Sequence, residues 1–68
     1  MIEQHLHNID NGKLYKAVNN SILVMWYSSK KEWGRCCTTY NDLFDVNGYL
    51  EETFVCIDDI GLIEDLKQ

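Results

Sequence analysis

The longest apolar run in the chain, Ile22–Tyr27, contains six consecutive residues without a charged or amide side chain. It is short and rich in β-branched and aromatic residues, which favours a strand over a helix. Because successive side chains of a strand point to opposite faces, a run that is apolar throughout predicts a strand covered on both sides. We therefore expect this segment to be the central strand of a sheet.

Two Asn-Gly dipeptides, at residues 11–12 and 47–48, are the strongest turn signals in the sequence. Both residue types tolerate the positive φ of a type I′ turn, so each dipeptide predicts a hairpin that joins two strands directly. The remaining pattern of apolar runs and polar breaks predicts strands at 14–18, 33–40 and 53–57, with turns at 19–20 and 28–32.

The two ends of the chain leave alternatives open. Apolar residues at positions 2, 6 and 9 have helical spacing, with Gly12 as a C-terminal cap, but the same stretch fits the first arm of a hairpin. Residues 60–66 also have helical spacing after an N-cap at Asp58 or Asp59. Gly61 weakens that helix by about 1 kcal/mol.

These elements predict a mainly β protein. We expect a small antiparallel curled sheet or open barrel of about five short strands, with one short terminal helix if residues 60–66 are helical. A sheet with one helix across a face, of the α+β class, is the alternative.

The length of 68 residues and the hydrophobic fraction of 46% predict one small domain, residues 1–68. A core of this size typically contributes about 3–5 kcal/mol of stability, so a further source of stability is expected. A single sheet from so short a chain covers two faces of Ile22–Tyr27 poorly. Pairing of two copies would bury the second face, and we therefore expect a homodimer.

The chain shows no targeting signal. No apolar run approaches the ~20 residues that span a bilayer, and the N-terminus lacks the basic start and apolar stretch of a signal peptide. Three cysteines, two of them adjacent, do not form a disulfide framework. We therefore expect a cytoplasmic protein without contact to a membrane.

Composition gives a hint of the source. Six Asn, six Ile and five Lys stand against one Ala, one Arg and no Pro, a bias typical of an AT-rich gene. In size and composition, over its whole length, the chain resembles small phage and prophage proteins of low-GC Gram-positive bacteria. No motif carries this resemblance, and it transfers no functional residue.

Candidate metal ligands and nucleophiles are His5, His7, Cys36, Cys37 and Cys56. Adjacent cysteines on a strand point to opposite faces, and the chain has no Cys-x-x-Cys spacing, so we expect no metal site and no cofactor. Gly-rich phosphate loops and the Gly-x-Ser-x-Gly and His-Glu-x-x-His motifs are also missing from the sequence. We expect a protein that is not an enzyme.

The charges are unevenly distributed along the chain. Residues 1–41 carry five basic and three acidic residues, whereas residues 42–68 carry eight acidic residues against Lys67, which gives +2 and −7 for a net charge of −5. Such polarity steers a basic partner toward the acidic half. The acidic residues of that half are Asp42, Asp45, Glu51, Glu52, Asp58, Asp59, Glu64 and Asp65.

The charge pattern predicts a protein-interaction module that presents these carboxylates to a basic partner. One such partner is a nucleic-acid-binding host protein whose groove accepts carboxylates in place of phosphates, a device that the resemblance to small phage proteins implies as a class. Trp33, expected on the same strand face as Arg35, is a candidate anchor if it is exposed, although a cap on one end of the core fits it better.

Two other functions stay open. One is a structural or regulatory homodimer without a role for the acidic surface. The other is binding of single-stranded nucleic acid, by base stacking and phosphate contacts, which the net charge of −5 disfavours. The residues that would bind it are Trp26, Tyr27, Lys30, Lys31, Trp33 and Arg35.

Overall fold

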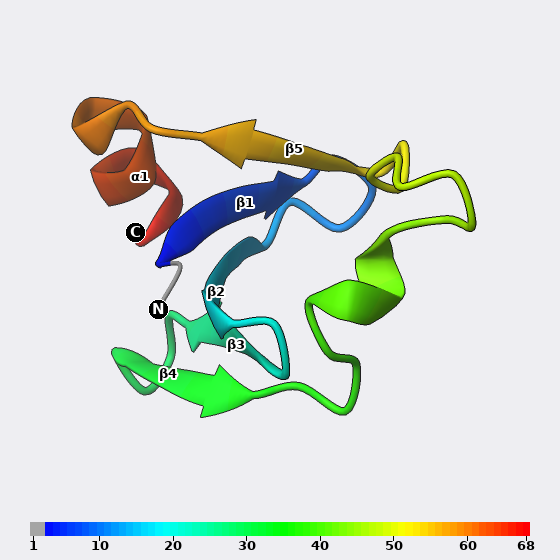
Figure 1. Ribbon diagram of the computed structural model, residues 1–68. Helices are drawn as coiled ribbons and strands as arrows, with labels where there is room; N and C mark the ends of the chain where they lie inside the picture. Colours follow the sequence, from blue (N-terminus) through cyan, green and yellow to red (C-terminus); the bar gives the residue numbers. More distant parts are fainter. Residues whose placement is uncertain (1–2) are drawn as a thin grey trace.

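The structure of the chain, a computed structural model, describes residues 3–68. Five strands form one antiparallel sheet in the order β4-β3-β2-β1-β5, with β4 and β5 at its two edges (Figure 1). The predicted mainly β class, with about five short strands and a C-terminal helix, is confirmed; the sheet is open. The elements are β1 (Gln4–Asn8), β2 (Leu14–Asn19), β3 (Ile22–Tyr27), β4 (Glu32–Arg35), the 3₁₀ turn η1 (Asn41–Leu43), β5 (Phe54–Ile57) and α1 (Ile60–Leu66).

The strand Ile22–Tyr27 forms as predicted, but it is not the central strand. β2 occupies the centre, and β3 lies between β2 and the edge strand β4. The run is apolar on both faces because each face of the sheet is covered by a different part of the same chain. Leu23 packs against η1 on one side, and Trp26 packs against α1 on the other. The homodimer was predicted because a single chain was expected to leave one face of β3 uncovered. Since the same chain covers both faces, that reason no longer applies, and the homodimer stays a prediction.

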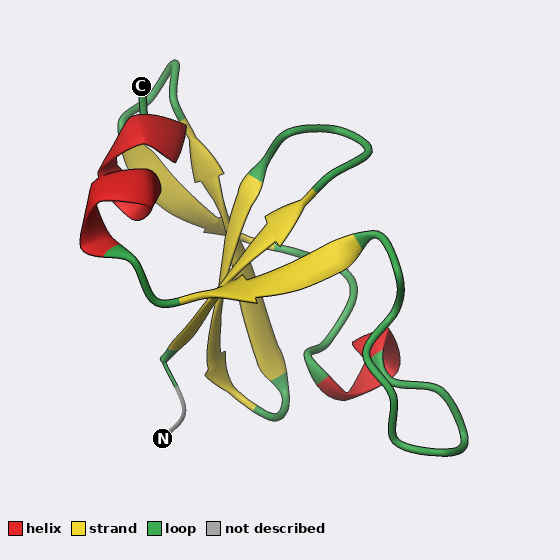
Figure 2. Ribbon diagram, turned by 90° about the horizontal axis from the view of Figure 1, so that it is seen from above, coloured by secondary structure: helices red, strands yellow, loops and turns green. Residues whose placement is uncertain are grey.

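The segment between residues 33 and 57 differs most from the predicted strands. β4 ends at Arg35, and residues 36–53 cross one face of the sheet without a regular strand. The Asn47–Gly48 dipeptide does form a tight turn, with Gly48 at φ +85°, but it joins only an isolated bridge between Phe44 and Leu50. The predicted strand over 33–40 is thus too long, and the second Asn-Gly dipeptide does not join two strands of the sheet. Figure 2 shows this segment and α1 on opposite sides of the sheet.

The first Asn-Gly dipeptide lies in the β1–β2 connection, as predicted, but the loop spans residues 9–13 and Asn11 does not have a positive φ, so the predicted type I′ turn that joins the strands directly is wrong. Gly12 has φ +72°, a backbone conformation that glycine adopts at little cost. The buried Asn8 organises this loop, because its side-chain oxygen accepts hydrogen bonds from the backbone N–H groups of Asp10 and Asn11 over 2.9 and 3.1 Å. Residues 4–8 are therefore a hairpin arm and not a helix; Ile2 lies outside the described residues.

The C-terminal helix begins at an N-cap, Asp59, whose carboxylate accepts hydrogen bonds from the N–H groups of Gly61 and Leu62 over 2.9 and 3.3 Å. The cap satisfies two donors that no residue of the helix can reach. Ile63 is the buried residue of the helix and packs with Leu14 and Ile57 on the sheet. Within residues 3–68, no helix has the length and apolar character needed to cross a membrane.

Candidate functional site

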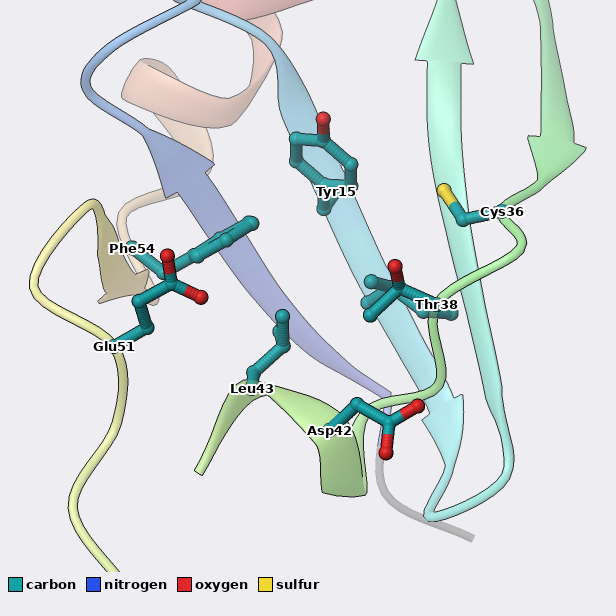
Figure 3. Close-up of a pocket in the computed structure, with 8 residues that line it drawn as sticks. Tyr15, Cys36, Thr38, Asp42, Leu43, Glu51 and Phe54 are labelled. Carbon is teal, nitrogen blue, oxygen red and sulfur yellow. The ribbon is translucent and has the colours of Figure 1, made fainter. Parts of the chain in front are cut away.

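An acidic hollow lies on the face of the sheet that residues 36–53 cover. It has a volume of about 450 Å³. Its apolar lining comes from β2, β3, η1 and β5, and two carboxylates flank it (Figure 3). The lining residues are Tyr15, Leu23, Cys36, Thr38, Asp42, Leu43, Glu51 and Phe54.

The floor of the acidic hollow is part of the hydrophobic core. Leu23 and Leu43 are almost fully buried, with 2% and 4% of their surface exposed. The Phe54 ring packs against Tyr15 edge to face, with ring centroids 5.2 Å apart. This packing gives the hollow a fixed apolar base, because core side chains of this kind occupy few rotamers.

Each of the two flanking carboxylates accepts a hydrogen bond from a residue of its own loop. One Asp42 oxygen accepts a hydrogen bond from the backbone N–H of Thr39 over 3.3 Å, and the Thr39 hydroxyl accepts one from the N–H of Asp42 over 3.3 Å. Glu51 accepts a hydrogen bond from the Thr53 hydroxyl over 3.3 Å. The Glu51 backbone N–H donates to the carbonyl of Leu43 over 2.7 Å, which ties the two sides of the hollow together.

A second hollow of about 350 Å³ adjoins the first and shares Asp42, Leu43 and Glu51 with it. Asp45 and Glu52 also line it, so four of the eight predicted acidic residues border the two hollows. The other four, Asp58, Asp59, Glu64 and Asp65, lie between β5 and the end of α1. The structure thus divides the acidic half of the chain into two groups.

The tip of the 45–49 turn presents exposed apolar side chains next to the second hollow. Val46 is fully exposed and Tyr49 is 71% exposed. The turn is held by Asp45, whose side chain accepts hydrogen bonds from the N–H groups of Asn47 and Tyr49 over 2.8 and 3.0 Å. The Asn-Gly dipeptide between Val46 and Tyr49 predicts the turn, but nothing in the sequence pattern indicates that these two side chains are exposed.

Trp33 does not lie near the acidic hollow. It is half-buried on the helix side of the sheet, where its ring packs edge to face against Trp26 at 5.3 Å between centroids. The Lys16 ammonium lies 4.6 Å from the centre of the Trp33 ring, and that of Lys67 lies 5.7 Å from it. This placement corresponds to a cap on the core, which was the alternative to an exposed anchor.

The histidines and cysteines are divided among β1, β5 and the start of the segment that follows β4. His5 and His7 are both on β1, Cys36 lines the acidic hollow, and Cys37 and Cys56 are exposed with free thiols. Residues 3–68 contain no group of three or more His, Cys, Asp or Glu side chains arranged to hold a metal ion. Burial, with a smaller contribution from Cys37, raises the pKa of the Cys36 thiol, which lowers its thiolate fraction and its reactivity.

Comparison of the chain with protein-family models, curated proteins and solved structures finds no significant match. The geometry of the chain offers a hollow with an apolar floor and two carboxylates at its rim.

Proposed function

We propose that this protein is a non-enzymatic interaction module whose acidic hollow receives long basic side chains of a protein partner. The observation that supports this most is the position of Asp42 and Glu51 around a floor of Leu23, Leu43 and Phe54. Arginine and lysine bury their methylene stems on apolar surface and keep the charged group at a polar rim. A hollow with an apolar floor and an anionic rim matches both parts of such a side chain.

Charge supports the same proposal. The net charge of −5 attracts basic partners over a Debye length of about 8 Å at physiological ionic strength. The exposed pair Val46 and Tyr49 adds apolar contact area beside the carboxylates, and tyrosine is a residue type enriched at protein interfaces. Cytoplasmic localisation and a phage origin belong to the same proposal; three free thiols and the composition favour them.

The placement of the two tryptophans makes stacking on nucleic-acid bases the weaker alternative. The Trp26 and Trp33 rings pack against each other and against the helix-side core, and the Trp26 N–H is bonded to the backbone of Lys67. Stacking of bases needs open ring faces. Base stacking would therefore require the two rings to leave these contacts, whereas binding of a basic side chain in the acidic hollow would not.

The test is a titration of isotope-labelled protein with N-acetylarginine amide, followed by NMR. We expect the amide signals of Asp42, Leu43, Glu51 and Phe54 to shift, and the shifts to shrink at about 0.5 M salt, where the Debye length is about 4 Å. N-acetylcitrulline amide, a neutral analogue of similar shape, is the ligand control. It should produce much smaller shifts.

Matched variants complete this test. The double variant Asp42→Asn/Glu51→Gln should lose the shifts, whereas Glu64→Gln/Asp65→Asn, with the same change in net charge on α1, should retain them. Shifts spread over all acidic residues alike, or equal responses of the two double variants, would overturn the proposal.

A further inference from the structure

The sheet ends on one side at β5, and within residues 3–68 no strand lies beyond it (Figure 1). The register with β1 shows which backbone groups of β5 point outward. His7 and Val55 are partners, as are His5 and Ile57, and the Ile9 N–H donates to the Thr53 carbonyl over 2.8 Å. In an antiparallel ladder this phase turns Val55 and Ile57 toward β1 and leaves the N–H and C=O of Cys56 and the C=O of Phe54 directed outward.

β5 lacks the features that usually protect an edge strand. Edges are commonly blocked by charged side chains, proline, bulges or a covering element. All four side chains of β5 are uncharged, its pairing with β1 is regular, and Val55 is 40% exposed. The opposite edge, β4, carries Glu32 and Arg35, and a side chain larger than hydrogen at Gly34 would collide with the ring of Tyr27.

Acidic residues stand at both ends of β5. Glu51 and Glu52 precede it and Asp58 and Asp59 follow it, and all four are exposed. In a two-fold antiparallel pairing of two β5 strands centred on Val55, the outward groups of Cys56 and Phe54 meet, residue 58 of one copy faces residue 52 of the other, and residue 59 faces residue 51. Carboxylates would then meet carboxylates at both ends, which opposes pairing with a second copy.

We infer that β5 is a docking edge for an extended partner segment that is apolar in its centre and carries lysine or arginine at both ends. Such a segment adds a sixth strand, accepts a hydrogen bond from the outward N–H of Cys56 and donates to the outward carbonyls of Phe54 and Cys56. Its flanking cations meet the acidic pairs at the two ends of β5. The basic character of the partner is the part of this inference that depends on the proposed function.

The probe for this edge is an eight-residue peptide of the sequence Lys-Lys-Val-Thr-Val-Thr-Lys-Lys with blocked ends. We expect the backbone amide of Cys56 to exchange with solvent at least about tenfold more slowly when the peptide is saturating, because that N–H becomes hydrogen-bonded. The amide of Arg35 on β4 should not change. Alkylation of the Cys56 thiol should slow relative to that of Cys37, which serves as an internal reference.

Two control peptides separate strand addition from charge attraction alone. A peptide of the same sequence with N-methyl groups on the alternate residues whose N–H groups face β5 cannot donate to the carbonyls of Phe54 and Cys56. It should bind at least about tenfold more weakly. A peptide with glutamate in place of lysine should not protect Cys56. Equal binding of the N-methylated peptide would overturn the inference.

Protein variants test the two acidic ends. Asp58→Asn/Asp59→Asn removes two charges and retains an N-cap residue for α1, since asparagine caps as well as aspartate. This variant and Glu52→Gln should each weaken peptide binding by about two- to tenfold. Asp42→Asn should weaken binding of N-acetylarginine amide but leave protection of Cys56 unchanged, so failure of this inference and failure of the proposed function are distinguishable.

The oligomeric state provides the remaining outcome. The number of protein chains per particle, from light scattering, should be the same with and without peptide, because β5 does not pair with a second copy. If the mass doubles with protein concentration and Cys56 becomes protected without peptide, the edge binds a second copy, and the inference of a basic segment is overturned.

Discussion

The indole Nε1 of Trp26, on β3, donates a hydrogen bond to the backbone carbonyl of Lys67 over 2.9 Å. The two residues are 41 positions apart, and the bond ties the end of α1 to the sheet. The carbonyl of Lys67 follows the last helical residue, where backbone acceptors have no partner within the helix. A side chain of the sheet thus supplies a hydrogen-bond donor to the C-terminal end of the helix.

We expect Trp26→Phe to destabilise the protein by about 1 kcal/mol more than Trp33→Phe. Both variants remove the same group from the same aromatic pair, but the structure shows an indole hydrogen bond only for Trp26 among the described residues. Urea denaturation of both variants measures the difference. Equal losses would show that packing alone accounts for the role of Trp26.

Removal of the N-cap should fray α1. Asp59→Ala removes the acceptor of two backbone N–H groups, and we expect a loss of about 1 kcal/mol in the free energy of unfolding. Asp59→Asn should retain most of the stability, which separates the cap from the charge. Thermal denaturation compares the two variants, and an equal loss in both would contradict the role of the cap.

A side chain at Gly34 should displace the ring of Tyr27. A methyl group at Gly34 would collide with the ring of Tyr27, which is partly exposed. We therefore expect Gly34→Ala to cost about 1 kcal/mol, at the low end for overpacking. In a Tyr27→Ala background the same substitution should be neutral or stabilising, because alanine is better than glycine within a strand. A double-mutant cycle measures this coupling, and additive effects would exclude it.

The charge state of His5 should make stability depend on pH. Burial, followed by the nearby cations of Lys16 and Lys67, lowers the pKa of His5 below 6.5, its usual value. The unfolded chain therefore binds more protons than the folded one between the folded-state pKa and 6.5, and stability falls as the pH drops through this window. The contribution of His5 to the free energy of unfolding is fully present above about pH 7.5.

Chemical denaturation between pH 5 and 8 tests this dependence. His5→Gln should flatten the decrease in stability with falling pH, and His7→Gln, on the same strand, should retain the part due to His5. A profile in His5→Gln identical to that of the natural chain would show that other groups cause the dependence.

Strands β2, β3 and β5 were predictable because the local pattern decides them, whereas the pattern left β1 open between a helix and a hairpin arm and made β4 too long. Ile22–Tyr27 is a strand in any arrangement that covers its two faces, and an aspartate at 58 or 59 before an apolar periodic stretch indicated the start of a helix in spite of Gly61. The position of β3 within the sheet was not predictable, because strand order depends on the pairing of β1 with β5 across 50 residues. A strand covered on its two faces by segments of its own chain has the same apolar pattern as one covered by a partner subunit. The pattern of Ile22–Tyr27 therefore did not distinguish the two.

The segment 36–53 shows where local pattern fails. Thr38 and Thr39 favour an extended strand, but Thr39 instead exchanges hydrogen bonds with Asp42 and opens the turn at η1. The acidic residues were visible as a charge bias. Their division into two groups, and the apolar floor between Asp42 and Glu51, depend on how this segment folds over the sheet.

The pairing of β1 with β5 also has a kinetic consequence. β1 to β4 are neighbours along the chain and join through short loops, whereas Leu6 and Cys56 meet only after a loop of about 50 residues closes. Closing that loop costs chain entropy before the contact returns any free energy, so β5 should join after the transition state for folding. Val55→Ala should then raise the unfolding rate and leave the refolding rate nearly unchanged, whereas Val24→Ala should slow refolding; stopped-flow measurements separate the two. On this view, the outermost strand beside α1 is the last to assemble and the first to detach.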